Sequence, residues 1–367
     1  MNTPKISTSQ LFWMTFSNEI AMTLFATQSR VIQMTKQDAW MSFLIGGLIA
    51  CGITFLIVTV TRLYPAQTLV EFSRTILGKW FGKVVVVPFF VAWIFVSSTI
   101  LRQFSDFFQM IMYDRTPTIV LMLMMMVIVV VLVGAGGIEA IGRCSQLLGP
   151  VIMAIIIMTI CLSYKNFEFD QLLPLYTDSG IKAIIQGSLA PASVLGDTLF
   201  LLVLTSFMDN PRQGTKITLW SVATGSVLCF ALTLTALSIF GPSLASKMLF
   251  PTFEMMRYVS LLEFIQNIEI FSSVIWFFSV FIKLSVYLFT ASYGISQWLG
   301  LKPWTRSIWV IAPVVFLLAW MLPYTGLFAF QIQLQLGVRY MLPTVLIGIP
   351  LLLWIVGTAR QRFSINR

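Results

Sequence analysis

The sequence contains no histidine, few cysteines and little charge. Asp, Glu, Lys and Arg together make up only 10% of its 367 residues. Without imidazole, neither a zinc or haem site nor a nucleophile paired with a histidine base is expected. The cysteines stand singly, without CxxC spacing, so a disulfide framework is not expected. They are Cys51, Cys144, Cys161 and Cys229.

Hydrophobic residues dominate instead, at 58% of the chain, and the mean hydropathy is +0.90. A helix needs about 20 apolar residues to cross a bilayer, so a chain of this length holds roughly ten crossings. We therefore predict an all-α polytopic membrane protein, with residues 1–367 forming a single transporter-like domain. No cleavable signal peptide is expected, because the first apolar segment lacks a small-residue cleavage site. An enzyme, a bound cofactor and a nucleic-acid partner are not expected.

The apolar runs predict where the spans lie and how they are oriented. An even number of spans places both termini on one side, and the basic residues gather on that side. Arg74, Lys79 and Lys83 are examples. The positive-inside rule then predicts that both termini are cytoplasmic. The predicted spans are residues 9–33, 40–62, 84–112, 118–136, 147–164, 181–207, 215–240, 268–297, 305–323 and 338–358.

The sixth predicted span is interrupted. Pro191 and Gly196 lie near the middle of a segment that is otherwise long enough to cross. Proline removes a backbone donor, and glycine tolerates a left-handed conformation, so we predict a helix break here. A break is tolerated in lipid only where the freed backbone groups face protein, a cavity or a ligand. A harmless proline kink is the alternative.

Charged residues lie inside other spans. Glu19 interrupts the first apolar run, Asp197 follows Gly196, and Lys283 has apolar residues on both sides. Such residues are expensive in hydrocarbon, which makes these three candidates for function, with a structural ion pair as the alternative. Arg102 and Glu269 lie nearer the ends of their spans. For these two residues, the alternative to a functional role is that the side chain extends to the membrane interface and keeps its charge in water.

Three connections have distinctive compositions. Residues 66–82 predict a short interfacial helix, with Gly78 at a helix end and Trp80 among headgroups. Residues 250–269, which include Glu254, Arg257 and Glu263, predict an outer helical segment that gates access or docks a partner. For residues 66–82 and 250–269, the alternative is that the segment only packs against the bundle and has no function. Residues 134–137 lack the Lys-Ser/Thr of a phosphate loop and are expected to end the fourth span.

Five short phrases of the sequence are distinctive as a set. They are Lys36-Gln37-Asp38-Ala39-Trp40, Leu77-Gly78-Lys79-Trp80-Phe81-Gly82, Arg115-Thr116-Pro117, Leu172-Leu173-Pro174, and Pro251-Thr252-Phe253-Glu254 with Arg257. Together they resemble the B-subunit family of spore germinant receptors, a branch of the amino acid, polyamine and organocation transporter superfamily. The resemblance covers nearly the whole chain.

The resemblance implies a LeuT-like fold with five-plus-five inverted repeats and breaks in helices one and six. It implies a receptor for a small nutrient, often an amino acid, in the inner membrane of the spore, with an A subunit and a lipoprotein C subunit as partners. The pocket would lie between spans one, three, six and eight. The ligand-binding candidates are Glu19, Ala21, Met22, Thr23, Ala190, Pro191, Ser193, Gly196, Asp197, Ile282 and Lys283.

The chain also departs from the family pattern. Ala21 and Thr23 stand where the first span of relatives usually has glycines, and Asn267 stands where an arginine is usual. In sodium-coupled members of the fold, a sodium ion bridges spans one and eight. We expect Lys283 to replace that ion and to pair with Glu19, with Asp197 as competitor, so that ligand binding is independent of sodium.

Two functions fit the sequence. The first is a signalling receptor subunit that binds a nutrient and triggers germination, and the second is a secondary amino-acid transporter. Both need the same pocket, and the loop phrases favour the receptor. A purely structural scaffold would explain neither the interrupted sixth span nor the buried charges.

Overall fold

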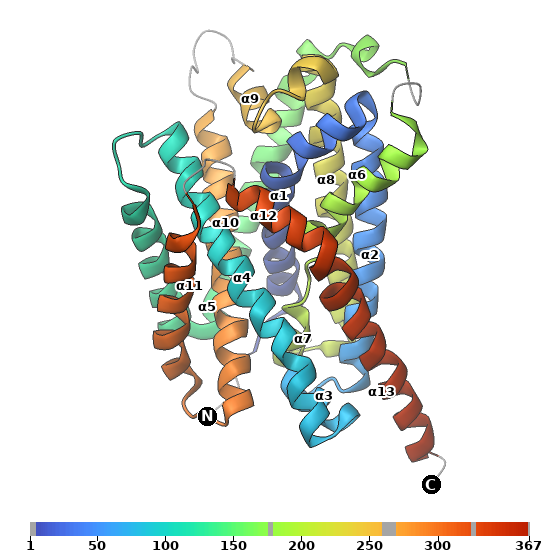
Figure 1. Cartoon of the computed structure of the whole chain (residues 1–367), viewed down its shortest axis with the longest axis vertical. Coiled ribbons are helices and arrows are strands. Elements are labelled where there is room, and N and C mark those ends of the chain that lie inside the picture. The colour runs from blue at the N-terminus through green and yellow to red at the C-terminus, as the bar shows by residue number, and fades with distance from the viewer. Residues whose placement is uncertain (1–4, 175–178, 259–268, 324–327, 366–367) are drawn as a thin grey trace.

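The computed structural model describes residues 5–174, 179–258, 269–323 and 328–365, and these form an all-helical bundle (Figure 1). The start of α1 and the end of α13 lie at one end of the bundle, and α9 lies at the other. The helices are α1 (Thr8–Thr35), α2 (Ala39–Leu63), α3 (Leu69–Leu77), α4 (Lys79–Ile111), α5 (Thr118–Ser163), α6 (Gly180–Leu195), α7 (Leu201–Leu204), α8 (Pro211–Ala245), α9 (Pro251–Tyr258), α10 (Glu269–Leu299), α11 (Ile308–Met321), α12 (Phe328–Leu336), a π-helical segment (Gly337–Gly348) and α13 (Ile349–Ile365).

Seven helical segments of the described chain are long and apolar enough to cross a membrane. Thr8–Leu63 contains α1 and α2, and Phe328–Arg362 contains α12, the π-helical segment and most of α13. Thr118–Asn166 contains α5, which is kinked at Gly137, where φ is 56°. Only glycine adopts this conformation readily, so Gly137 ends the first half of α5 as predicted. The count of ten spans and the inverted repeat stay predictions.

Helix α1 runs to the centre of the bundle, where it packs against α5, α6, α8 and α10. It is continuous from Thr8 to Thr35, so the predicted break near Ala21 and Thr23 is wrong. The absence of glycine explains this: these residues keep helical geometry, and the Thr23 hydroxyl donates to the Glu19 carbonyl at 2.7 Å. A threonine bonded in this way satisfies its own hydroxyl inside the helix, so it needs no break in the backbone.

Helix six is broken, as the sequence predicts. α6 ends at Leu195, and the chain resumes a short helix, α7, at Leu201. Gly196 has φ −84°, so the left-handed conformation expected for it is wrong. Glycine is required for close packing instead, because a Cβ there would lie 2.7 Å from the Ala192 carbonyl oxygen and 2.9 Å from Ile53 Cδ1 of α2. Pro191 remains inside α6.

The two predicted short helices are present in part. α3 is a separate helix that ends at Gly78, and the exposed Trp80 belongs to the first turn of α4. α9 covers the first part of residues 250–269 and carries Glu254 and Arg257. Residues 259–268, with Glu263 and Asn267, lie outside the described residues.

Candidate functional site

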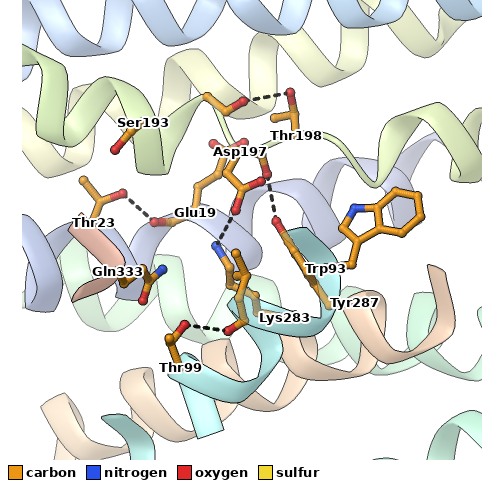
Figure 2. Close-up of polar contacts among 12 residues, drawn as sticks. Glu19, Thr23, Trp93, Thr99, Ser193, Asp197, Thr198, Lys283, Tyr287 and Gln333 are labelled. Atoms are coloured by element: carbon orange, nitrogen blue, oxygen red, sulfur yellow. Dashed lines mark hydrogen bonds and ion pairs between the residues drawn. The ribbon is translucent and has the colours of Figure 1, made fainter. Parts of the chain in front are cut away.

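The centre of the bundle holds an ion pair across the break in helix six (Figure 2). Lys283 Nζ of α10 lies 3.9 Å from Asp197 Oδ2, and both side chains are buried. The expected direct contact of Lys283 with Glu19 is therefore wrong, because the competitor Asp197 takes that place; Glu19 interacts with the ammonium only from beyond 4.0 Å. The physical reason is the break itself, because the chain leaves α6 just before Asp197 and brings its carboxylate to α10.

Tyr287 supports the same arrangement from α10. Its hydroxyl donates to the Asp197 carbonyl oxygen at 3.2 Å, and Lys283 Nζ lies 5.5 Å from its ring centroid. Lys283 and Tyr287 are one turn apart and share a helix face, so a single face of α10 holds both the side chain and the backbone of Asp197. Sequence reasoning missed Tyr287, although its i+4 spacing from Lys283 was a usable signal.

Glu19 of α1 is the third charged group of this centre. Its side chain is fully buried, and neither carboxylate oxygen has a hydrogen-bond partner among the residues that the structure describes. The carboxylate packs against α8, where the position of a Cβ on Gly225 would be 3.5 Å from Oε2. A buried carboxylate without hydrogen bonds is costly, which marks Glu19 as a group retained for a reason other than stability.

Helix α2 also contacts the segment at the break in helix six. Thr54 of α2 and Thr198 share a hydrogen bond of 3.3 Å between their hydroxyls. With Gly196 packed against Ile53, two points of α2 contact the segment between α6 and α7. Contacts from both α2 and α10 thus hold the segment that carries Asp197.

The other predicted ligand-binding residues surround this centre. Met22 and Thr23 are buried in α1, and Ala21 lies in the same turn. Pro191 and Ser193 are buried in α6, where the Ser193 hydroxyl donates to the Ala190 carbonyl at 2.8 Å. Ile282 is buried next to Lys283 in α10. The fold therefore brings spans one, six and eight together at these residues.

A cavity of about 420 Å³ lies beside residues 249–250, which directly precede α9. α1, α6, α12, the π-helical segment and the connection before α9 line it, and Ala190 is the one predicted ligand-binding residue among its lining. Arg30 and Arg339 also line it. Neither arginine was among the predicted ligand-binding residues. The polar run from Gln28 to Gln33 at the end of the first span was the available signal.

An aromatic layer lies between the cavity and the charged centre. Phe25, Phe250 and Phe330 line the cavity. Phe25 contacts Trp276 of α10 with ring centroids 4.3 Å apart, and Phe107 of α4 lies 5.5 Å from Trp276. Trp276 precedes Lys283 by seven residues, which places it about 10 Å away along the helix axis. On α1, Phe25 stands between Glu19 and Arg30, so these rings lie between the two polar regions along α1 and α10.

A second polar cluster joins α4 to α12. Arg102 does not snorkel: it is buried, and its Nε lies 2.9 Å from Asp106 Oδ1. The Gln103 side chain donates to Gln333 Oε1 at 2.6 Å and to the Ala329 carbonyl at 2.9 Å. An i,i+4 carboxylate gives Arg102 a local partner, so the guanidinium does not need to reach the interface.

The arrangement matches known transporters at the level of the fold. Mhp1, a nucleobase-cation-symport-1 family transporter, in a closed conformation with bromovinylhydantoin bound, superposes with a TM-score of 0.69 at 12% identity, over 94% of this chain and 78% of that one. A substrate-bound, outward-open Na⁺-coupled sialic acid symporter gives 0.67 at 13% identity, over 97% and 90%. MhsT in complex with L-phenylalanine gives 0.62 at 12% identity, over 98% and 99%.

The chain is thus an integral membrane protein with the LeuT-like transporter fold. Within that class it belongs to the spore germination protein family, whose model matches residues 5–325. Its relatives include spore germination protein YndE of Bacillus subtilis (strain 168), 24% identical over 62% of each chain. Spore germination protein KB of the same organism is 21% identical over 72% of this chain and 71% of that one. The match to YndE thus spans less than two thirds of its length.

Proposed function

We propose that this protein is the nutrient-sensing membrane subunit of a spore germinant receptor. It binds a small nutrient, an amino acid, in a transporter-like pocket and so triggers germination. The family match over residues 5–325 is the observation that carries the proposal. The relatives named germination proteins and the transporter fold support it together, because a substrate pocket can serve as a sensor.

The proposed pocket surrounds the break in helix six. Its polar groups are Glu19, Asp197 and Lys283, and the turns from Ala21 to Thr23 and from Ala190 to Gly196 provide its walls. Binding sites of transporters commonly lie at such breaks, because backbone groups there are free of the helical ladder. An ammonium and a carboxylate, the two charged ends of an amino acid, both find opposite charges in this region.

The proposal includes partners and a location. We infer that the chain assembles with a germinant receptor A subunit and a lipoprotein C subunit in the inner membrane of the spore, with both termini in the cytoplasm. The names of the germination relatives support a place in such a complex.

Spores that differ only in this gene would test the function. Spores carrying the gene, lacking it, or carrying a Gly196→Trp variant are exposed to single nutrients, and germination is followed by loss of optical density. We expect at least one amino acid to act only on spores with the intact gene. The same response in spores without the gene would refute the proposal. Membrane immunoblots of the variant serve as the expression control.

A secondary amino-acid transporter is the second candidate. Its support is the fold, since the structures above include a cation-symport family transporter and a Na⁺-coupled symporter. Uptake of radiolabelled amino acids into proteoliposomes separates the two functions. Net accumulation inside the vesicles would favour transport, and saturable binding without accumulation would favour the receptor.

A further inference from the structure

The cavity beside residues 249–250 has a one-sided charge. Its lining contains two arginines, Arg30 of α1 and Arg339 of the π-helical segment, together with four glutamines and no Asp or Glu. Among the residues that the structure describes, neither guanidinium has a carboxylate within 4.0 Å. Two cations thus border one concave site without an anionic partner.

This chemistry favours an anion. A guanidinium offers five donors in a planar fork that matches a carboxylate, and both arginines are exposed, so a ligand that enters the cavity can reach them. Glutamine amides nearby, such as Gln186 of α6 and Gln335 of α12, add donors and acceptors that can orient a small ligand. We propose that this cavity is an entry site, separate from the pocket at the break in helix six, that binds the nutrient through its carboxylate, with Arg30 and Arg339 as the partners of that group.

The rest of the lining indicates an organic anion. Phe25, Phe250 and Phe330 give the cavity an aromatic surface opposite its polar groups, and all three are almost completely buried. A volume of about 420 Å³ is within the range of small-molecule sites, which are mostly apolar with a few convergent polar groups. These rings also pack on one another, with centroids 5.6 Å apart for Phe25 and Phe250 and 5.7 Å apart for Phe250 and Phe330, so they form a fixed apolar wall beside the polar groups.

The cavity is separate from the charged centre, and the contact between Phe25 and Trp276 connects the two regions. Phe25 lines the cavity and also contacts Trp276, which lies on the same helix as Lys283. The carboxylate is therefore bound outside the aromatic layer, while Glu19, Asp197 and Lys283 lie inside it.

This inference rests on the proposed function, and a binding experiment tests it directly. The purified full chain in detergent is screened with the twenty L-amino acids, and its Tm is followed by tryptophan fluorescence. We expect at least one amino acid to raise the Tm. Its carboxamide, which lacks the anionic charge, should bind about tenfold more weakly or worse, because hydrogen bonds between charged groups are the strong ones.

Variants locate the site. Arg30→Gln and Arg339→Gln should each weaken binding of that amino acid about tenfold or more. Arg115→Gln is the matched control, because Arg115 is exposed and does not line the cavity, and binding should not change. If a Gln variant has a lowered Tm without ligand, Arg30→Lys or Arg339→Lys replaces it; the charge then remains while the planar fork is lost.

Three results would overturn the inference: equal binding of acid and carboxamide, undiminished binding to both arginine variants, or no amino acid that raises the Tm. Germination assays on spores distinguish failure of this inference from failure of the proposed function. If spores with either arginine variant respond like wild type while spores lacking the gene do not respond, the inference fails and the proposed function stands. If spores lacking the gene keep every response, the proposed function fails.

Discussion

Replacing Lys283 with methionine tests the ion pair at the centre of the bundle. The Lys283 ammonium lies 3.9 Å from the Asp197 carboxylate. At an effective dielectric constant of about 20, two unit charges at this distance attract each other by about 4 kcal/mol. Methionine keeps the apolar stem but leaves Asp197 buried without its counter-charge. We therefore expect Lys283→Met to lower the free energy of unfolding by about 3–5 kcal/mol.

A double replacement shows which carboxylate is the partner. Lys283→Met combined with Asp197→Asn should recover part of the loss, because Asp197 then carries no unpaired charge, while Glu19 stays buried without the ammonium in both variants. Lys283→Met combined with Glu19→Gln should not, because Asp197 stays charged and alone. The free energy of unfolding is measured in mixed micelles with increasing SDS, by tryptophan fluorescence. The control is Lys182→Met on the exposed part of α6, which should change stability by less than about 0.5 kcal/mol.

Two outcomes would refute this reasoning. Additive losses in the Lys283 and Asp197 double variant, with a coupling energy below about 0.5 kcal/mol, would mean that the pair contributes nothing to stability. Recovery with Glu19→Gln in place of Asp197→Asn would mean that Lys283 pairs with α1 instead.

Other predictions concern the helix break, α9 and ions. Gly196→Ala should destabilise the protein by about 1–3 kcal/mol, because its methyl group would meet a backbone oxygen at 2.7 Å; Gly52→Ala, with nothing within 4 Å, is the control in thermal unfolding. Gln28→Leu removes the acceptor that caps the start of α9, so hydrogen exchange of residues 250–258 should become faster; unchanged exchange would contradict this. Replacing Glu254 and Arg257 together should shift the nutrient dose needed for germination, whereas normal assembly and an unchanged dose would favour simple packing. Ligand binding should be equal in sodium and choline buffers, and a sodium requirement would exclude Lys283 as the substitute cation.

The sequence is sufficient to predict the features that depend on local composition. Long apolar runs predict an all-helical membrane protein, and Pro191 and Gly196 inside such a run predict the break in helix six. Lys283 could be expected inside the bundle because apolar residues flank it on both sides. Each of these features follows from the lack of water in the bilayer core, where polar groups must find partners inside the protein. That requirement can be read from local composition alone.

The remaining features depend on tertiary geometry. Glu19 and Asp197 were both reasonable partners for Lys283, and only the direction of the chain after α6 decides between them. Polar residues in the first span suggested a break, yet a threonine hydroxyl that bonds within the helix leaves α1 intact. Arg30 and Arg339 lie at opposite ends of the sequence, so the cavity that they share could not be predicted without the fold.

Because Lys283 is covalently part of the chain, the cation beside the broken helix does not depend on the ion concentration in solution. An ion taken from solution occupies its site only as long as its concentration exceeds its dissociation constant, whereas a side-chain ammonium has a fixed local concentration that dilution cannot change. Symporters named for Na⁺ coupling draw on an ion gradient across their membrane. In this chain the cation beside the broken helix is part of the polypeptide, so it is present whether or not the membrane is energised.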